Sequence, residues 1–211
     1  GNFGKFFAQK FATAFDVTVW DSNNLSTEAK ALGLEWATLE EIAEKDLVVL
    51  AVPLRSMEPL LLKLSSLINL NTLVIDVCSV KQEPLRLMQK YLPEQGLLCT
   101  HPMFGPQSAK DSWDGHRLVI CHADLSPKTE LVLQFFRNQG LKLFEMTAKQ
   151  HDQEMARVQA LTHFVARALT ECKIKKSPFG TVAYNHLCEV VELLGGDSWE
   201  LFETIELGNP Y

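Results

Sequence analysis

The chain has 211 residues, of which 46% are hydrophobic and 22% charged, a balance typical of a globular protein. A formal net charge of −6 without a long Lys/Arg run argues against a nucleic-acid partner, and no apolar run is long enough to span a membrane. The five cysteines are scattered without a Cys-x-x-Cys pair, so we expect reduced thiols, no metal site and a cytoplasmic protein.

The first two thirds of the chain alternate short β-rich runs with helical patterns. Strands are predicted over residues 16–20, 47–52, 72–76, 97–101, 117–121 and 141–145. Helices are predicted between them over residues 6–15, 57–68, 82–91 and 127–139. This alternation predicts an α/β fold with a Rossmann-type, mostly parallel sheet. The run 47–52 is apolar on both faces, which indicates a central strand covered by helices on two sides.

After residue 146 the pattern is helical throughout. Thr147 and Gln150 have the spacing of a capping box, which would open a long helix that ends near residue 172. Two more helices are predicted over residues 181–194 and 198–207.

We therefore expect two domains, an α/β domain at residues 1–147 and an all-helical domain at residues 148–211. Both ends of the sequence look incomplete, and the helical part is short for a domain that must bury its own apolar faces. An exposed face there would suit a homodimer interface or further helices.

Half of a glycine motif opens the chain. Gly1-Asn2-Phe3-Gly4 precedes a helix and matches the last two glycines of G-x-G-x-x-G, whose backbone approaches a pyrophosphate. Asp21 follows the next strand, 17 residues after Gly4, close to the spacing of the carboxylate that binds the adenosine ribose. That carboxylate would repel a 2′-phosphate, so the sequence predicts NAD rather than NADP in the α/β domain. Asp21 could instead only begin a turn with residues 22–24.

Two later strand ends should lie beside the same cofactor. Val52 and Pro53 follow one apolar strand, and Ser79 follows the next. Ser79 could orient the nicotinamide or a catalytic imidazole, or it could cap the helix that begins near Lys81; these roles are compatible.

His101 ends a predicted strand and opens the loop His101-Pro102-Met103-Phe104-Gly105-Pro106. Open α/β sheets hold their chemistry at this edge, and the free pKa of imidazole suits proton transfer near neutral pH. Taken alone, His101 is more simply interpreted as a strand-end residue in an ordinary turn. The cofactor motif and a second histidine, His163, favour a catalytic role.

The long helix after residue 150 has two distinct faces. One is an apolar stripe that we expect in the core, formed by Val158, Leu161, Val165 and Leu169. The other is small and polar, formed by Asp152, Ala156, Gln159, His163 and Arg167. The second face either lines a cleft or is solvated, and its combination with His101 favours the cleft.

These motifs resemble the prephenate and arogenate dehydrogenases of tyrosine biosynthesis. The resemblance is carried, in the order of the family, by residues 1–4, 79–81, 101–106 and 151–164. It implies a Rossmann domain joined to a helical dimerisation domain, with a small-molecule substrate and a homodimer. It also implies that His101 acts on the substrate hydroxyl, that Ser79 helps to position it, and that His163 lines the substrate pocket. The first strand and first glycine of the family pattern are missing from the sequence.

The implied reaction is an oxidative decarboxylation, of prephenate to 4-hydroxyphenylpyruvate or of arogenate to tyrosine. A hydride goes to NAD, carbon dioxide leaves and the ring becomes aromatic, while neutral His101 accepts a hydrogen bond from the hydroxyl. The substrate carboxylates need donors, for which Arg167, Arg157 and Lys81 are candidates, although each is equally well explained as a surface residue. Gln159 could also bind the substrate, and the His151-Asp152 pair is expected to stabilise the start of its helix.

Two other classes of function remain open. A β-hydroxyacid dehydrogenase or an imine reductase has a similar architecture, but the hydroxyacid enzymes generally use a lysine where this chain has His163. A non-catalytic NAD-binding regulatory module would retain Gly4 and Asp21 but would not need His101 together with His163. No residue of the sequence distinguishes prephenate from arogenate.

Overall fold

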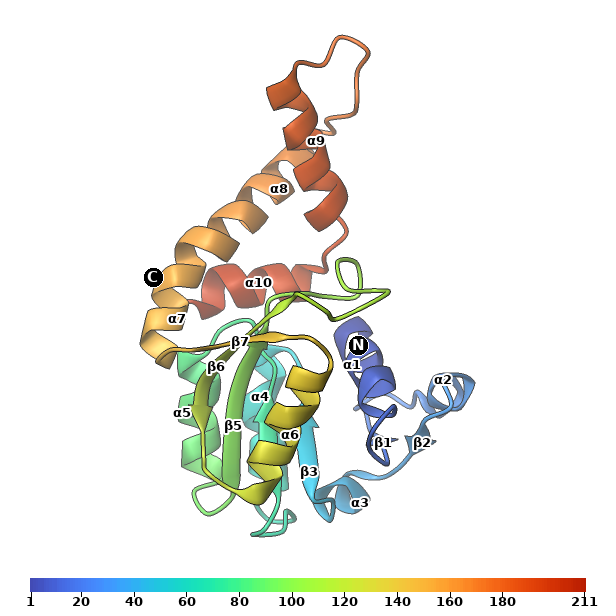
Figure 1. Ribbon diagram of the computed structural model, residues 1–211, viewed down its shortest axis with the longest axis vertical. Coiled ribbons are helices and arrows are strands. Elements are labelled where there is room, and N and C mark those ends of the chain that lie inside the picture. The colour runs from blue at the N-terminus through green and yellow to red at the C-terminus, as the bar shows by residue number, and fades with distance from the viewer.

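The computed structural model describes residues 1–211 and is built around a five-stranded sheet of order β3-β4-β5-β6-β7 (Figure 1). The strands are β3 (Leu47–Leu50), β4 (Leu73–Asp76), β5 (Gly96–Pro102), β6 (Arg117–Ala123) and β7 (Lys142–Glu145). Neighbouring strands are parallel except for β5 and β6, which are antiparallel. The predicted α/β fold with a mostly parallel, Rossmann-type sheet is therefore confirmed.

Helices cover both faces of this sheet: α1 (Asn2–Phe11), α4 (Leu54–Leu64), α5 (Gln82–Tyr91) and α6 (Pro127–Asn138). Side chains alternate between the faces of a strand, so β4 contributes Leu73 and Ile75 to the core beneath α1 and α6, and Val74 to the core beneath α4 and α5. All four residues of β4 are buried. The prediction that 47–52 is a central strand is wrong, because β3 is the edge strand of this sheet and only Val48 and Leu50 are buried.

A second, two-stranded parallel sheet lies beside the first and pairs β1 (Thr18–Val19) with β2 (Glu35–Trp36). Two short helices flank it, α2 (Ser26–Ala31) and α3 (Leu39–Ala43). The sequence predicted only the strand at 16–20, because elements of two to six residues are too short to show a hydrophobic period.

The chain after β7 is helical, as predicted, with α7 (Ala148–Met155), α8 (Leu161–Glu171), α9 (Val182–Leu194) and α10 (Trp199–Gly208). A π-helical segment, η1 (Ala156–Ala160), joins α7 to α8 and was not predicted. The helices α8 and α9 project away from the sheet as a hairpin, and α10 returns to it (Figure 1).

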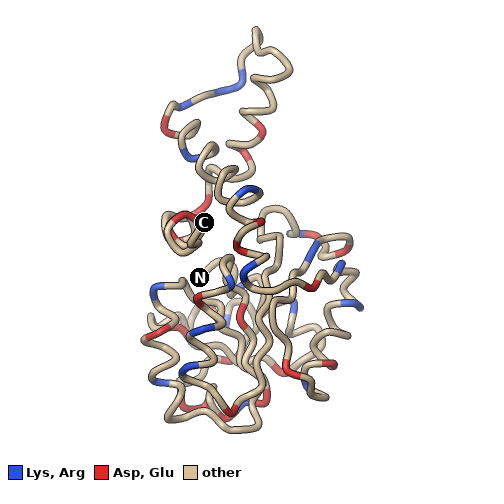
Figure 2. Tube along the Cα trace, turned by 90° about the vertical axis from the view of Figure 1, so that its left-hand side faces the viewer, with Lys and Arg blue, Asp and Glu red and all other residues tan.

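The apolar stripe of the long helix does not lie in a core, contrary to prediction. Val158 is 46% exposed and Leu161 is 59% exposed, because nothing in the chain packs over this side of the hairpin. Figure 2 shows basic and acidic residues intermingled in both parts of the molecule. All five cysteines are unpaired, and none of the helices has the length and apolar content needed to cross a membrane.

Candidate active site

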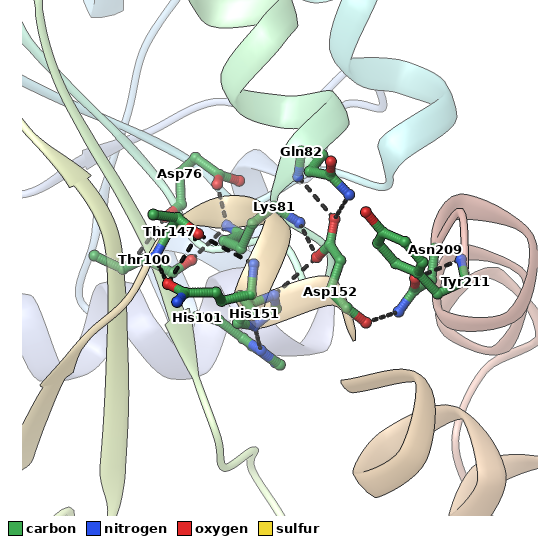
Figure 3. Close-up of polar contacts among 11 residues, drawn as sticks. Asp76, Lys81, Gln82, Thr100, His101, Thr147, His151, Asp152, Asn209 and Tyr211 are labelled. Carbon is green, nitrogen blue, oxygen red and sulfur yellow. Dashed lines mark hydrogen bonds and ion pairs between the residues drawn. The ribbon is translucent and has the colours of Figure 1, made fainter. Parts of the chain in front are cut away.

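A buried histidine lies at the carboxyl-terminal edge of the sheet. His101 is the penultimate residue of β5, and the pairing of β5 with β6 shifts register between Cys99 and Thr100, just before it. Such irregularities bend a strand and redirect the side chains beside them. His101 is 3% exposed, and its Nδ1 lies 2.8 Å from Nε2 of His151 (Figure 3). One ring nitrogen of His101 is therefore already hydrogen-bonded, while Nε2 is left without a protein partner.

His151 and Asp152 are neighbours on α7 and contact each other as well as the sheet. Nδ1 of His151 lies 2.8 Å from Oδ1 of Asp152, and both side chains are fully buried. The Asp152 carboxylate also accepts hydrogen bonds from the backbone N–H groups of Lys81, at 2.8 Å, and Gln82, at 2.9 Å (Figure 3). Asp152 thus caps the N-terminus of α5 from a different helix, which joins the helical part to the sheet.

Two sequence predictions about charged residues are corrected here. Asp152 does not stabilise the start of its own helix, because Thr147 and Gln150 already form a complete capping box there. Lys81 cannot meet a substrate carboxylate, because its side chain is fully buried in an ion pair with Asp76 beneath the site. Burial lowers the pKa of Lys81, but the charge of Asp76 and the hydrogen bond to it have the opposite effect. The pKa is raised overall, and the ammonium stays protonated.

The surroundings of His101 keep it neutral. Burial lowers its pKa well below 6.5, and the protonated forms of the neighbouring His151, Lys81 and His163 would lower it further. Burial raises the pKa of Asp152, but the hydrogen bonds from His151 and from the two backbone amides outweigh this effect. The pKa of Asp152 is therefore lower than that of an ordinary aspartate. At neutral pH the site therefore contains the uncharged imidazole of His101 and the ionised carboxylate of Asp152. The residue between them in space is His151, which contacts both.

His163 lies on α8, in the helical part, and its charge is the last of the causes that lower the pKa of His101. His163 is 9% exposed, and its Nδ1 lies 3.5 Å from Oδ2 of Asp197. Arg167, one turn further along α8, donates to the backbone oxygen of Asp197 at 3.0 Å and lies over the ring of Trp199 at 4.2 Å. Asp197 therefore contacts both His163 and Arg167, two of the residues that the sequence singled out.

The polar face of the long helix is not continuous, contrary to prediction. The π-helical residues 156–160 change the rotation per residue, so Asp152 contacts α5 while His163 contacts Asp197. Gln159 lies within this segment, half-buried and without a side-chain hydrogen bond, and Arg157 is exposed. Neither is held toward His101 by a contact.

The start of α1 has the features of a dinucleotide site. Its N-terminus has no side-chain cap, and a Cβ on Gly4 would lie 3.5 Å from that of Ala51, where the helix approaches the end of β3. Asp21 follows β1, and its Oδ1 accepts a hydrogen bond from the backbone amide of Asn23. The free N–H groups at the start of α1 and this carboxylate fit the pyrophosphate and the ribose of NAD.

The other predicted cofactor residues lie at the same edge of the sheet. Val52 and Pro53 join β3 to α4, and Ser79 joins β4 to α5. Ser79 is half-buried and makes no side-chain hydrogen bond, so in this structure His151 rather than Ser79 orients His101. The ring of Phe3 is partly buried, stacks on Phe7 at 5.5 Å and packs against the core beneath α1.

This combination defines a class: a Rossmann-type nucleotide-binding fold with buried histidines at the edge where such folds bind substrates. Residues 7–145 match the family described as "Prephenate dehydrogenase, nucleotide-binding domain", and the chain belongs to the prephenate dehydrogenase family. The resemblance inferred from the motifs is thereby confirmed.

Individual relatives agree with this assignment. The chain is 34% identical over its whole length to "Arogenate dehydrogenase 2, chloroplastic" of Arabidopsis thaliana, and spans 62% of that protein. It is 27% identical over 98% of its length to a "Probable arogenate/prephenate dehydrogenase" of Methanocaldococcus jannaschii, and spans 50% of it. The crystal structure of prephenate dehydrogenase from A. aeolicus, in complex with hydroxyphenyl propionate and NAD+, matches 99% of this chain and 79% of its own, with a TM-score of 0.79 and 21% identity. This last likeness concerns the fold alone.

Proposed function

We propose that the chain carries the site of an NAD-dependent arogenate or prephenate dehydrogenase, which oxidatively decarboxylates its substrate in tyrosine biosynthesis. The observation that carries this proposal is the buried, neutral His101, held by His151 at the edge of the sheet that fits NAD. The family membership and the names of the relatives support it. They do not favour a hydroxyacid dehydrogenase, an imine reductase or a regulatory module.

The residues of the chain would divide the reaction between the two parts of the molecule. NAD, when bound, supplies the hydride acceptor; its phosphates would meet the start of α1 and its ribose Asp21, which favours NAD over NADP. His101 accepts a hydrogen bond from the ring hydroxyl through Nε2, supporting the oxygen as the carbon that bears it loses hydride. Burial of this imidazole excludes competing water, and Ser79 lies at the neighbouring strand end.

The helical part would recognise the charged groups of the substrate. His163 and Arg167 both contact Asp197 and are candidate donors for a substrate with two carboxylates. Asp197, paired with His163, adds a half-buried carboxylate. The ammonium group of arogenate would find an acceptor there, whereas the keto group of prephenate would not. Gln159 has no fixed contact and remains a weaker candidate.

Reduction of NAD in the presence of prephenate and of arogenate, assayed in parallel, tests the proposal. We expect absorbance from NADH with at least one of them, together with the matching aromatic product by chromatography, and a lower rate with NADP. The His101→Asn variant serves as the matched control for background reduction. NAD binding without turnover of either substrate would contradict the proposal and favour the regulatory module.

We also infer that a second copy of this chain covers the hairpin of α8 and α9. Large apolar side chains are exposed along it: Leu161 at 59%, Phe164 at 59% and Val182 at 74%. Large apolar side chains left exposed in this way favour association with another surface. Sedimentation of the protein should report a dimer, which a Phe164→Asp substitution dissociates; a monomer at all concentrations would contradict this inference.

A further inference from the structure

A buried row of hydrogen bonds connects Asp152, His151 and His101 (Figure 3). The two links are both 2.8 Å long, one between the Asp152 carboxylate and Nδ1 of His151, the other between Nε2 of His151 and Nδ1 of His101. Asp152 is held in turn by two backbone amides of α5, and its own backbone oxygen accepts from the side chain of Asn209 at 2.8 Å. The Asp152 end of this row is therefore held by the start of α5 and by Asn209, the C-cap residue of α10.

The chemistry of the groups gives this row a direction. The ionised carboxylate of Asp152 can only accept, so Nδ1 of His151 must donate to it. In its neutral form His151 carries one N–H, and because that N–H is given to Asp152, Nε2 of His151 is an acceptor. Nδ1 of His101 must then donate to His151, and Nε2 of His101 is left with a free lone pair. Without His151, the neutral ring of His101 would be free to place its proton on either nitrogen.

We propose that His151 and Asp152 are positioning residues that hold the proton of His101 on Nδ1, so that Nε2 always faces the substrate as an acceptor. The catalytic consequence rests on the proposed function, because it concerns the ring hydroxyl of that substrate. A hydroxyl donates its hydrogen bond only to an unprotonated nitrogen, so the wrong tautomer of His101 would repel the group that it has to bind.

The other charged groups around His101 do not provide this control. Lys81, below the strand, is paired with Asp76 and bonds the backbone oxygen of Thr100 rather than the ring. His163 acts on His101 only through its charge. No carboxylate contacts His101 directly, so the negative charge that favours its Nδ1–H tautomer reaches it only through His151.

Nitrogen NMR of the histidine rings tests the tautomer directly and needs no substrate. In the 15N-labelled protein at neutral pH, the resonances that disappear in His101→Asn identify His101. We expect its Nδ1 to be protonated and its Nε2 unprotonated in the wild type, with a mixture or the opposite tautomer once His151 is replaced. The opposite tautomer in the wild type would overturn the proposal.

Two substitutions of His151 separate positioning from mere support of the fold. The amide of Gln reaches the place of Nε2 and can accept from His101, whereas the shorter Asn reaches only the place of Nδ1 and keeps the contact with Asp152. We expect kcat of His151→Gln within about 10-fold of wild type, and that of His151→Asn lower by about 10²–10³-fold, with KM for NAD unchanged in both. A structural role predicts the reverse order, since Asn better preserves the cap on α5.

The control is His186→Gln, which changes an exposed histidine of α9 that pairs only with Glu189. It should match the wild type in both measurements. Equal losses in His151→Gln and His151→Asn, with wild-type tautomers in both, would overturn the positioning role. Failure of the proposed function would look different, because the wild type would then turn over neither substrate while the NMR measurement still reported the tautomer of His101.

Discussion

The strand-bearing part of the molecule (residues 1–147) and the helical part (residues 148–211) bury their apolar side chains very differently. The first contains two separate clusters of 15 buried residues each, one on either face of the sheet. The second buries mostly small or isolated apolar residues, namely Ala148, Met155, Ala166, Cys188 and Ile205. The sheet is therefore a self-sufficient scaffold, whereas the helices depend on surfaces that they do not supply themselves.

The helical part obtains some of that support from the sheet. Asn209 and Asp152 connect α10, α7 and α5. Arg55 on α4 pairs with Glu200 and, at 3.6 Å, with Glu203 on α10. The candidate site lies where the two parts meet, with His101 on the sheet and its partners His151 and Asp152 on α7.

The largest effect is expected from His101, which the sheet supplies. His101→Asn should lower kcat by about 10²–10⁴-fold, the usual contribution of a general base, while the affinity for NAD stays the same. Steady-state kinetics with the preferred substrate, together with NAD titration, measure both quantities. Near-normal turnover would remove His101 from the mechanism and shift the chemistry to the helical part.

A matched pair of phenylalanine substitutions tests the difference in burial itself. Phe136→Ala empties a fully buried position of the sheet core and should reduce the free energy of unfolding by about 3–5 kcal/mol. Phe164 is 59% exposed, so Phe164→Ala should change the free energy of unfolding of the monomer by no more than about 0.5 kcal/mol. Urea denaturation at low protein concentration compares them. Similar losses in both variants would mean that the helical part also has a tight core.

A smaller and more selective effect is expected at Asp197, on the helical side. Hydrogen bonds between charged groups contribute about 1.5–3 kcal/mol, so Asp197→Asn should lower kcat/KM for arogenate by about 10–100-fold. The value for prephenate should be unchanged or higher, which makes prephenate the internal control. Equal losses with the two substrates would assign Asp197 to the support of His163 alone.

The smallest effect is expected when the pH is lowered from 8 to about 6.5. Because the pKa of His101 is held well below 6.5, the imidazole is neutral and able to accept a proton throughout the range above that value. The rate should therefore stay level from pH 8 down to about 6.5, and fall only at lower pH as the ring gains its proton. A pH profile of kcat/KM measures this. A decline centred at 6.5 or above would show that the ring is more exposed to solvent than in this structure.

Local signals in the sequence were enough for the longer elements. The helix at 82–91 was predicted with the bounds that α5 has, and the helix predicted at 127–139 is α6, which begins at the predicted residue and ends one residue earlier. The strand bearing His101 was found because its apolar run ends in a Gly/Pro-bounded loop. The short β2, α2 and α3 were missed because they hold too few residues for a period to emerge.

The partners of the site could not be read in the same way. The π-helical segment before α8 and the register shift before His101 leave no mark in the hydrophobic pattern, yet both redirect side chains at the site. Because we assumed a regular helical rotation, we placed Asp152 and His163 on one face. The buried pairing of Lys81 with Asp76 was hidden for a similar reason, since a lysine near a helix start looks like a surface residue.

By itself, the sequence determined the alternating strands and helices, the glycine-led helix start, and the presence of histidines at a strand end and on a distant helix. These follow from local backbone preferences and from the period of apolar residues, which act within a few positions of the chain. Only the tertiary structure decided that His151, 50 residues from His101 along the chain, lies against its ring and that Asp152 caps another helix. A hydrogen bond depends on distance and direction in space, and the spacing of residues along the chain determines neither.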